Sequence, residues 1–296
     1  MKYGEIFLET LTNGSDEDRA KLAAAVQEWV QTEVVDASVV RKVLQVSNKP
    51  TERTENGEAA IYYKLSDDVT DAVEAIGDYT SLRVVRRPNV STVFCYIQTI
   101  GNILEVAKSV LRTAESVEQY LREQIVRYIN FHENKTLLSL LNAADSTPDD
   151  LAATAFDPSA VKEIVKLLTG NNLKAAAIII KESFWNDVFG WTNTVASDKT
   201  LDQIKARGAD AVTQFGGLNI IPIQDRVFTE AGVAANTDGF VVAAPQYLGW
   251  VNNPEPIKVK TETPFDTPGV VRFAYYERIG MVIGNTNAVA AFNFGS

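Results

Sequence analysis

A long helical pattern is the feature that most constrains the fold of this chain. It covers about residues 113–144, and no proline occurs between Pro88 and Pro148. A helix of about thirty residues is a rod about 45 Å long, because each residue adds about 1.5 Å. A compact domain of this size needs no such rod internally. We therefore expect a flat, elongated subunit built along this helix.

A hairpin signal upstream of the helix is the second constraint. Asn56-Gly57 tolerates the positive φ of a tight turn and separates the strand-like segments 41–53 and 58–66. Pro50 restricts the first of these strands to a sheet edge. The tip is charged and carries too few apolar residues to bury against its own domain, and a two-stranded ribbon is only marginally stable in water. We expect the hairpin to project and to be supported from outside the subunit.

The rest of the chain predicts a mixed α+β protein. Ser15 is the predicted N-cap of a first helix, which a short mobile arm precedes. Short helices and strands alternate over residues 148–252, with a helix start at Pro148 and an exposed polar loop at 224–238. A linker containing four prolines follows. The remaining strands are predicted at 174–181, 216–223, 239–244, 270–282 and 288–294.

Charge argues against a protein whose main task is to hold nucleic acid phosphates. The formal net charge is −10, and residues 1–80 alone carry eight basic and sixteen acidic side chains. One His, one Cys and two Met leave little material for soft metal sites or redox relays. The first residues have the wrong charge and too short an apolar run for a secretory signal, and no apolar stretch approaches membrane-spanning length.

Signatures of catalysis and nucleotide binding are missing from the sequence, so no catalytic, cofactor-binding or metal-binding residue is assigned. His132 falls on the predicted apolar face of the long helix, which favours a hydrogen-bonded core histidine over a general base. Cys95 lies among apolar residues and is expected to be a buried structural thiol. Asp67, Asp68 and Asp71 lack the spacing of a calcium loop and favour a solvated acidic turn.

The order of these elements resembles that of a known family. Three stretches carry the resemblance most clearly: 175–185, 216–223, and 271–280 leading to 287–290. In order and spacing, over nearly the whole chain, the sequence is similar to the major capsid protein of tailed bacteriophages, with the Hong Kong 97-type fold. The resemblance implies these parts: an N-arm at 1–48, a projecting E-loop hairpin at 49–88, an α/β A-domain at 148–252, and a P-domain at 89–147 and 253–296 with its spine helix at 113–144.

The resemblance implies a structural protein without enzymatic activity. It would assemble with copies of itself as pentamers and hexamers into an icosahedral virion shell, formed in the host cytoplasm. The shell would enclose double-stranded DNA without sequence-specific binding. A portal protein and a separate scaffolding or decoration protein are the other expected partners. By the same resemblance, the loop at 224–238 points to the axis of the pentamers and hexamers, and the turn at 284–287 lies at threefold-like junctions.

Assembly contacts are assigned to polar residues of the hairpin and the last strands: Lys49, Glu52, Arg53, Lys64, Glu277, Arg278 and Asn285. Some relatives crosslink an E-loop lysine to a P-domain asparagine with the help of a glutamate. Lys64, Asn285 and Glu277 have the right types in the right segments, but a noncovalent shell is favoured. Because the arm faces the shell interior in this family, its acidity is expected to repel DNA, and added salt is expected to promote assembly.

Two other functions are weighed against the virion shell. An encapsulin-like nanocompartment has the same fold but encloses an enzyme cargo, and the long arm and hairpin favour the phage shell over it. An α+β enzyme with a site in residues 148–252 is the third possibility. It is disfavoured by the scarcity of His and Cys and by the projecting hairpin.

Overall fold

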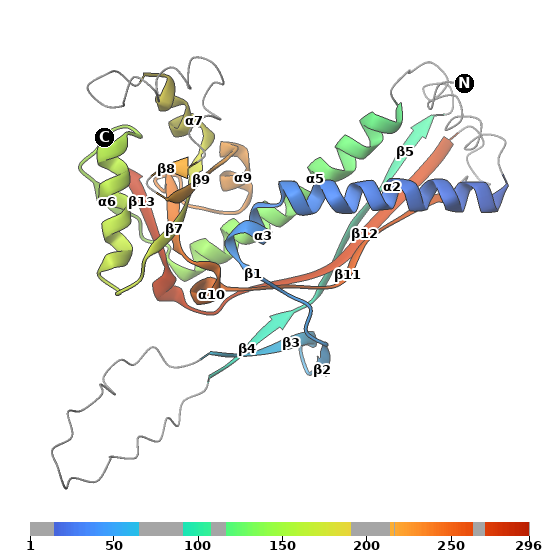
Figure 1. Cartoon of the computed structure of the whole chain (residues 1–296), viewed down its shortest axis with the longest axis horizontal. Helices are drawn as coiled ribbons and strands as arrows, with labels where there is room; N and C mark the ends of the chain where they lie inside the picture. The colour runs from blue at the N-terminus through green and yellow to red at the C-terminus, as the bar shows by residue number, and fades with distance from the viewer. Residues whose placement is uncertain are drawn as a thin grey trace, which may run out of the picture.

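The computed structural model describes residues 15–64, 91–107, 117–190, 214–215, 217–262 and 270–295. Three sheets and several helices form an elongated body, as the sequence predicts for a mixed α+β chain (Figure 1). The predictions of a mobile arm, of an acidic turn at Asp67 to Asp71 and of a helix start before residue 117 concern residues outside these ranges. Within them, no helix is long and apolar enough to cross a lipid bilayer.

A long β-ribbon with two helices forms one limb of the molecule (Figure 1). β11 (Gly249–Glu262) and β12 (Val270–Ile283) pair antiparallel, and β5 (Gln98–Ala107) extends the sheet beyond β12. The short β1 (Gln45–Ser47) pairs parallel with β11. Buried side chains of α2 (Asp16–Ala37) and α5 (Val117–Ala144) pack against the same sheet, and these two helices with the ribbon share one hydrophobic core.

The predicted linker with four prolines is wrong over residues 254–262, because this segment belongs to β11. The pairing register shifts on both sides of Glu255, so irregularities absorb Pro254 and Pro256. Beyond the prolines, side chains of α2 cover backbone groups of β11. Gln31 Nε2 donates to the carbonyl of Ile257 at 2.7 Å, and the amide of Val259 donates to Gln27 Oε1 at 3.3 Å. A helix thus protects an edge that would otherwise be open to strand pairing.

The long helix is confirmed, with 28 described residues and a length of about 42 Å. Its buried face differs from the predicted one. A row at four-residue spacing faces the interior, from Ile125 through Ile129 to Glu133 and beyond. Tyr128 and His132, predicted on this face, lie on its flank and are exposed. The prediction of a core histidine is therefore wrong, because the helix packs along the row that contains Ile129.

The hairpin forms, but inside a three-stranded sheet. β2 (Glu52–Thr54) lies at the edge, as Pro50 predicts, and pairs with β3 (Gly57–Lys64), which pairs with β4 (Ser91–Tyr96). The turn residues are Glu55 and Asn56, and Gly57 opens β3 with φ +126°. The expected two-stranded form of the hairpin is therefore wrong, and its support by a neighbouring subunit stays a prediction. A distant segment of the same chain supplies the third strand.

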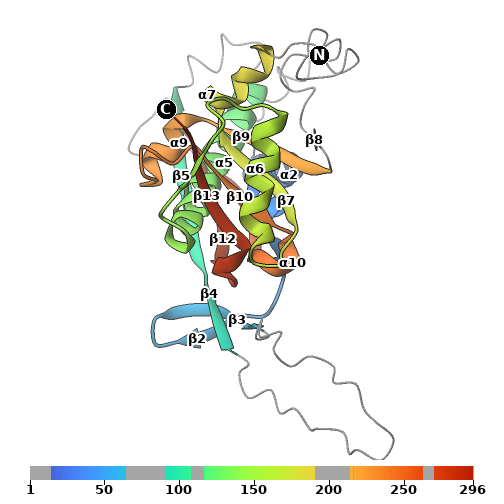
Figure 2. The same ribbon diagram turned by 90° about the vertical axis from the view of Figure 1, so that its left-hand side faces the viewer.

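A six-stranded mixed sheet with flanking helices forms the other limb (Figure 2). The strand order is β6-β13-β10-β7-β9-β8, and α6 packs over β10 and β13. The predicted strands at 174–181, 216–223, 239–244 and 288–294 are found. The bounds are β6 (Asp149–Leu151), α6 (Pro158–Thr169), β7 (Ala175–Lys181), α7 (Glu182–Trp185), η1 (Asn186–Gly190), β8 (Gln214–Phe215), β9 (Leu218–Ile223), β10 (Gly239–Ala243), α10 (Pro245–Leu248), η3 (Thr286–Ala288) and β13 (Val289–Phe294).

Two local predictions in this limb are wrong. The segment after Pro148 is β6, which pairs parallel with β13, and the helix begins at Pro158 with Asp157 as its N-cap. The predicted exposed loop at 224–238 contains the helix α9 (Asp225–Glu230), whose Val227 and Phe228 are buried. Because these apolar side chains are buried, the segment packs against the rest of the molecule, and α9 contacts α5.

Candidate assembly site

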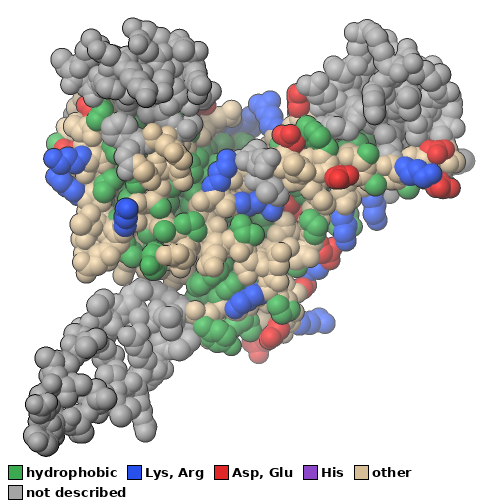
Figure 3. Space-filling model, in the orientation of Figure 1, with side chains coloured by type: hydrophobic (Ala, Val, Ile, Leu, Met, Phe, Trp, Pro, Cys, Tyr) green, Lys and Arg blue, Asp and Glu red, His purple; other side chains and the backbone are tan. Residues whose placement is uncertain are grey.

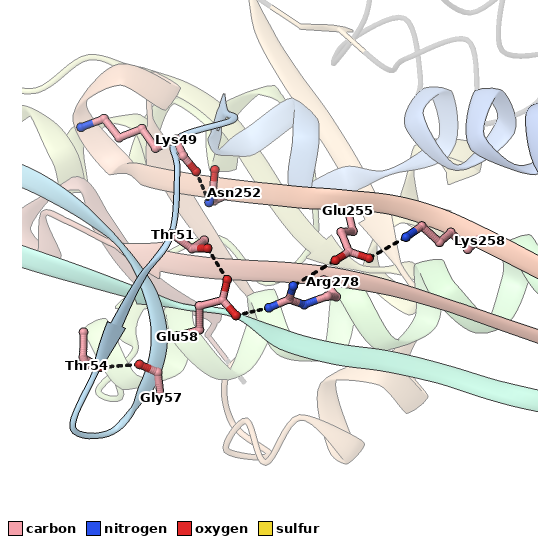
Figure 4. A network of polar contacts seen from close by, with 9 residues as sticks. All are labelled: Lys49, Thr51, Thr54, Gly57, Glu58, Asn252, Glu255, Lys258 and Arg278. Carbon is pink, nitrogen blue, oxygen red and sulfur yellow. Dashed lines mark hydrogen bonds and ion pairs between the residues drawn. The ribbon is translucent and has the colours of Figure 1, made fainter.

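A polar network joins the small sheet to the long ribbon (Figure 4). Arg278 of β12 lies at its centre. Its Nη1 is 3.0 Å from Glu255 Oε1 of β11, and its Nη2 pairs with Glu58 of β3. Glu58 also accepts a hydrogen bond from the Thr51 hydroxyl, and Glu255 pairs with Lys258 at 2.8 Å. One guanidinium therefore links the consecutive strands β11 and β12 to β3, which is distant in the sequence.

The charges of this network reinforce each other. The hydrogen bonds from Thr51 and Arg278 lower the pKa of the Glu58 carboxyl. Lys258 and Arg278 lower the pKa of Glu255 in the same way. The two carboxylates in turn raise the pKa of Arg278. The network therefore stays fully ionised around neutral pH.

The chain between β1 and β2 is fastened beside this network. Lys49 Nζ donates to the carbonyl of Ile61 at 3.2 Å and lies 4.7 Å from the centre of the Tyr62 ring. The carbonyl of Lys49 accepts a hydrogen bond from Asn252 Nδ2 at 3.1 Å. Tyr62 stacks on Trp250 with a centroid separation of 4.7 Å. The small sheet thus packs against the start of β11 and is charge-paired with β12 through Glu58 and Arg278.

A second polar cluster is buried between the limbs. Glu277 of β12 and Glu133 of α5 are both fully buried. Arg41, in the short helix α3 (Val39–Val43), lies 3.2 Å from Glu133 Oε1 and 3.6 Å from Glu277 Oε2. Ser38, the N-cap of α3, donates its hydroxyl to Glu133 Oε2 at 2.6 Å. One cation therefore faces two buried carboxyl groups.

Protonation of Glu277 resolves this excess of negative charge. Neither carboxyl oxygen of Glu277 has a hydrogen-bond donor among the described residues. Burial, together with the charge of Glu133, raises the pKa of Glu277 to about 8, although Arg41 opposes the shift. A protonated Glu277 donates a hydrogen bond to Glu133, so the neutral acid is the form that suits this site at pH 7.

Six of the seven predicted assembly residues fall into three environments. Lys49 and Arg278 hold the small sheet to the ribbon, whereas Glu52 and Arg53 are exposed on the edge strand β2. Glu277 is buried in the carboxyl cluster. Asn285 is also buried, and its Oδ1 accepts a hydrogen bond from the amide of Asn287 at 3.1 Å. Lys64 ends β3, where its backbone pairs with that of Ser91, and its side chain lies outside the description. Contact of any of them with a second subunit stays a prediction.

Sequence reasoning missed Glu58, Glu255, Glu133 and Arg41. The burial of Glu277 does have a sequence signal. Along β12 the buried residues Val271, Phe273, Tyr275 and Ile279 alternate with half-buried ones, and Glu277 occupies one of the alternate positions on the buried side. The four missed residues have partners that lie 23 to 220 residues away in the sequence. No local sequence pattern indicates which of these side chains will meet.

Replacing Arg278 with Gln tests the network. The variant loses both ion pairs to the carboxylates, so we expect amide hydrogen exchange in β2 and β3 to accelerate about two- to fivefold. Arg272→Gln is the matched control, since Arg272 lies on the same strand but pairs with Glu105 of β5 at 2.5 Å. Equal exchange of β2 and β3 in the wild type and Arg278→Gln would show that the network does not hold the sheet.

Comparison with known proteins points to one fold. No protein-family model matches the sequence, and a search of curated proteins finds no match. Solved structures match over most of the chain, and they show that this is the fold of the tailed-phage major capsid protein. At 11 to 14% identity the likeness is one of fold.

Three solved structures illustrate the match. The capsid of the cyanophage P-SCSP1u aligns with a TM-score of 0.57 at 11% identity, covering 88% of this chain and 89% of that chain. The capsid of an empty GTA particle gives a TM-score of 0.57 at 12% identity, with coverages of 88% and 90%. A virus-like particle from Pyrococcus furiosus gives a TM-score of 0.52 at 11% identity, with coverages of 91% and 98%.

Proposed function

We propose that this chain is a structural capsid subunit that assembles as pentamers and hexamers into an icosahedral shell around double-stranded DNA. The observation that carries the proposal is the capsid-protein fold, which extends over 88% of the chain and includes both limbs. The elongated shape fits a shell tile. In this proposal the protein is not an enzyme, and its role depends on the contacts that it makes with other subunits.

Exposed aromatic residues on the small sheet support a role in contacts between subunits. Tyr63 is 63% exposed, and Phe94 and Tyr96 are also exposed. Hydrophobic side chains are visible beside charged ones in the lower centre of Figure 3, where this sheet lies. Exposed apolar groups beside charges are typical of protein interfaces. A shell needs several modest interfaces of this kind, and their number around a closed lattice supplies the stability.

The finer parts of the proposal concern partners and location. The chain would work in the virion capsid, assembled in the host cytoplasm, with other copies of itself, a portal protein and a separate scaffolding or decoration protein. It would enclose DNA without reading its sequence, which suits a net charge of −10. The acidic residues 1–80 would repel the packaged DNA where they face it.

Electron microscopy of the purified full-length chain across a salt series tests the proposal. We expect closed shells, formed more readily as salt rises and charge repulsion is screened. Discrete monomers at every salt concentration would overturn it. The contents of the particles decide between the virion shell and the alternative, an encapsulin-like compartment: packaged DNA supports the first, and a co-purified enzyme cargo supports the second. The shared fold of the Pyrococcus particle is the observation behind that alternative.

A noncovalent shell is part of the proposal. The Glu277 carboxyl, the predicted helper for a lysine–asparagine crosslink, is fully buried beside Glu133 and Arg41. We expect purified particles to give one band near the 32.5 kDa monomer on a reducing, denaturing gel. A ladder of covalent oligomers that disappears in Lys64→Arg would contradict this expectation.

A further inference from the structure

The two limbs have separate hydrophobic cores, and α5 and β12 run through both of them. One core belongs to the six-stranded limb, and the other lies between the long ribbon and its two helices. α5 passes from one limb into the other (Figure 1), with Ile129 in the ribbon core and Leu137 in the core of the six-stranded limb. β12 makes the same passage, with Tyr275 in the first core and Ile279 in the second.

A fully buried polar residue lies at the boundary between the cores in each element. Glu133 separates the two apolar groups on α5, and Glu277 separates them on β12. The chain from α2 to α3 crosses the boundary at Ser38, which lies between Val34 of the ribbon core and Val39 of the other core. These polar residues meet around one arginine. A buried polar layer therefore divides the two cores.

This layer contains one cation for two carboxyl groups. Arg41 of α3 lies 3.2 Å from Glu133 Oε1 and 3.6 Å from Glu277 Oε2. Among the described residues, these are the charged groups that face Glu277. Its neighbour on β5 is the apolar Ile100, and on β11 the neutral amide of Asn253 lies beside Arg41. One proton held by the two carboxyl groups therefore balances the charge of the layer, whereas a second buried carboxylate would have no partner.

We propose that this polar layer is a pH-sensitive joint between the two limbs. With one proton in the layer, the carboxyl groups and Arg41 stay buried, and the limbs keep the observed arrangement. When the proton is lost, the unpaired carboxylate draws water into the layer, and the limbs turn relative to each other. The motion is centred on α3, because extended backbone at Ser38 already interrupts the helix there. The proposal does not depend on shell formation, since the joint lies within one subunit.

The pH range of opening follows from the proton balance. In the closed joint, burial raises the pKa of Glu277 to about 8, whereas a hydrated carboxyl ionises at about 4.3. The closed form therefore binds more protons than the open form. The ratio of open to closed molecules rises by up to about tenfold per pH unit between these two values and levels off above about pH 8. We expect closed molecules at about pH 5 and mostly open ones at about pH 9.

The distance between two spin labels, one on each limb, tests the proposal. The substitutions Ala24→Cys on α2 and Lys162→Cys on α6 supply exposed attachment sites, while Cys95 is buried and should not react. Labelled full-length chains are diluted with unlabelled ones, so that distances between subunits do not contribute. We expect one distance distribution at about pH 5 and a second one that predominates at about pH 9, with unchanged circular dichroism. An unchanged distribution over this range overturns the proposal, and so does a change that accompanies loss of helical signal.

Variants assign the response to the polar layer. Glu277→Gln and Glu133→Gln each leave a single carboxylate for Arg41, so both are expected to keep the low-pH distance distribution up to about pH 9. Glu33→Gln is the matched control, because Glu33 is an exposed carboxyl group on α2, and it should keep the wild-type response. A response that persists in either layer variant, or one that disappears in Glu33→Gln, contradicts the proposal.

Discussion

Replacing Glu277 with Gln is expected to remove a large part of the loss of stability that the protein suffers as pH rises. Burial raises the pKa of this carboxyl to about 8 in the folded state, whereas an unfolded chain releases the proton at the ordinary pKa of about 4.3. Between these values the folded state binds more protons than the unfolded state. The free energy of unfolding therefore falls as pH rises, by up to about 1.4 kcal/mol per pH unit.

The contribution of Glu277 is present in full below about pH 4.3 and is gone above about pH 8, where both states are ionised. Gln is a neutral amide of the same shape, and its N–H can donate to Glu133. We expect Glu277→Gln to be at least as stable as the wild type at pH 7 and to have a flatter stability profile from about pH 5 to pH 8.

Urea unfolding of both proteins at several pH values measures this difference. Glu255→Gln is the control, because the pKa of Glu255 is lowered by Lys258 and Arg278, so its contribution is lost only as pH falls. That variant should keep the wild-type slope above pH 5. If Glu277→Gln and the wild type lose stability in parallel between pH 5 and pH 8, Glu277 does not hold a proton in the folded state.

Replacing Gly280 with Ala is expected to displace the small sheet and to destabilise the fold by about 1–3 kcal/mol. A Cβ at this position would lie 2.6 Å from the backbone oxygen of Tyr96 and 2.9 Å from Cys95 Sγ. β4 crosses β12 at this point, and a backbone oxygen held in a sheet cannot move aside alone. The crossing therefore requires a residue without a side chain.

The reactivity of Cys95 reports on this crossing. The thiol is buried, and burial raises its pKa to about 11, so the wild type should react very slowly with thiol reagents. Labelling should be clearly faster in Gly280→Ala. Gly170→Ala is the matched control, since a Cβ there meets nothing within 4 Å, and its φ of −60° suits any residue. A Gly280→Ala protein with wild-type stability and labelling rate would show that β4 can shift freely.

The candidate site was only partly accessible to sequence reasoning. Arg278 and Lys49 were identified as residues of interest, and the structure places both in contacts that hold the small sheet to its neighbours. Their partners were not identified. Glu58 follows a tight turn and Glu255 lies between two prolines, and neither position carries a local sign that it will meet Arg278. Ion pairs between distant segments leave no periodic trace, because only the fold determines which side chains meet.

The sequence by itself determined the elements whose signals are local. The long helix, the strands β7, β10, β12 and β13, and the edge position of β2 follow from periodicity, turn residues and proline, which act within a few residues. The tertiary structure decided what those elements contact. In the folded protein, β3 pairs with β4, and β11 continues through two prolines where α2 packs against it. Residues 225–230 form a helix, and Glu277 is buried beside Glu133. Each of these outcomes depends on the burial or hydrogen bonding of a segment by another that is distant in the chain, and this energy is absent from any short window of sequence.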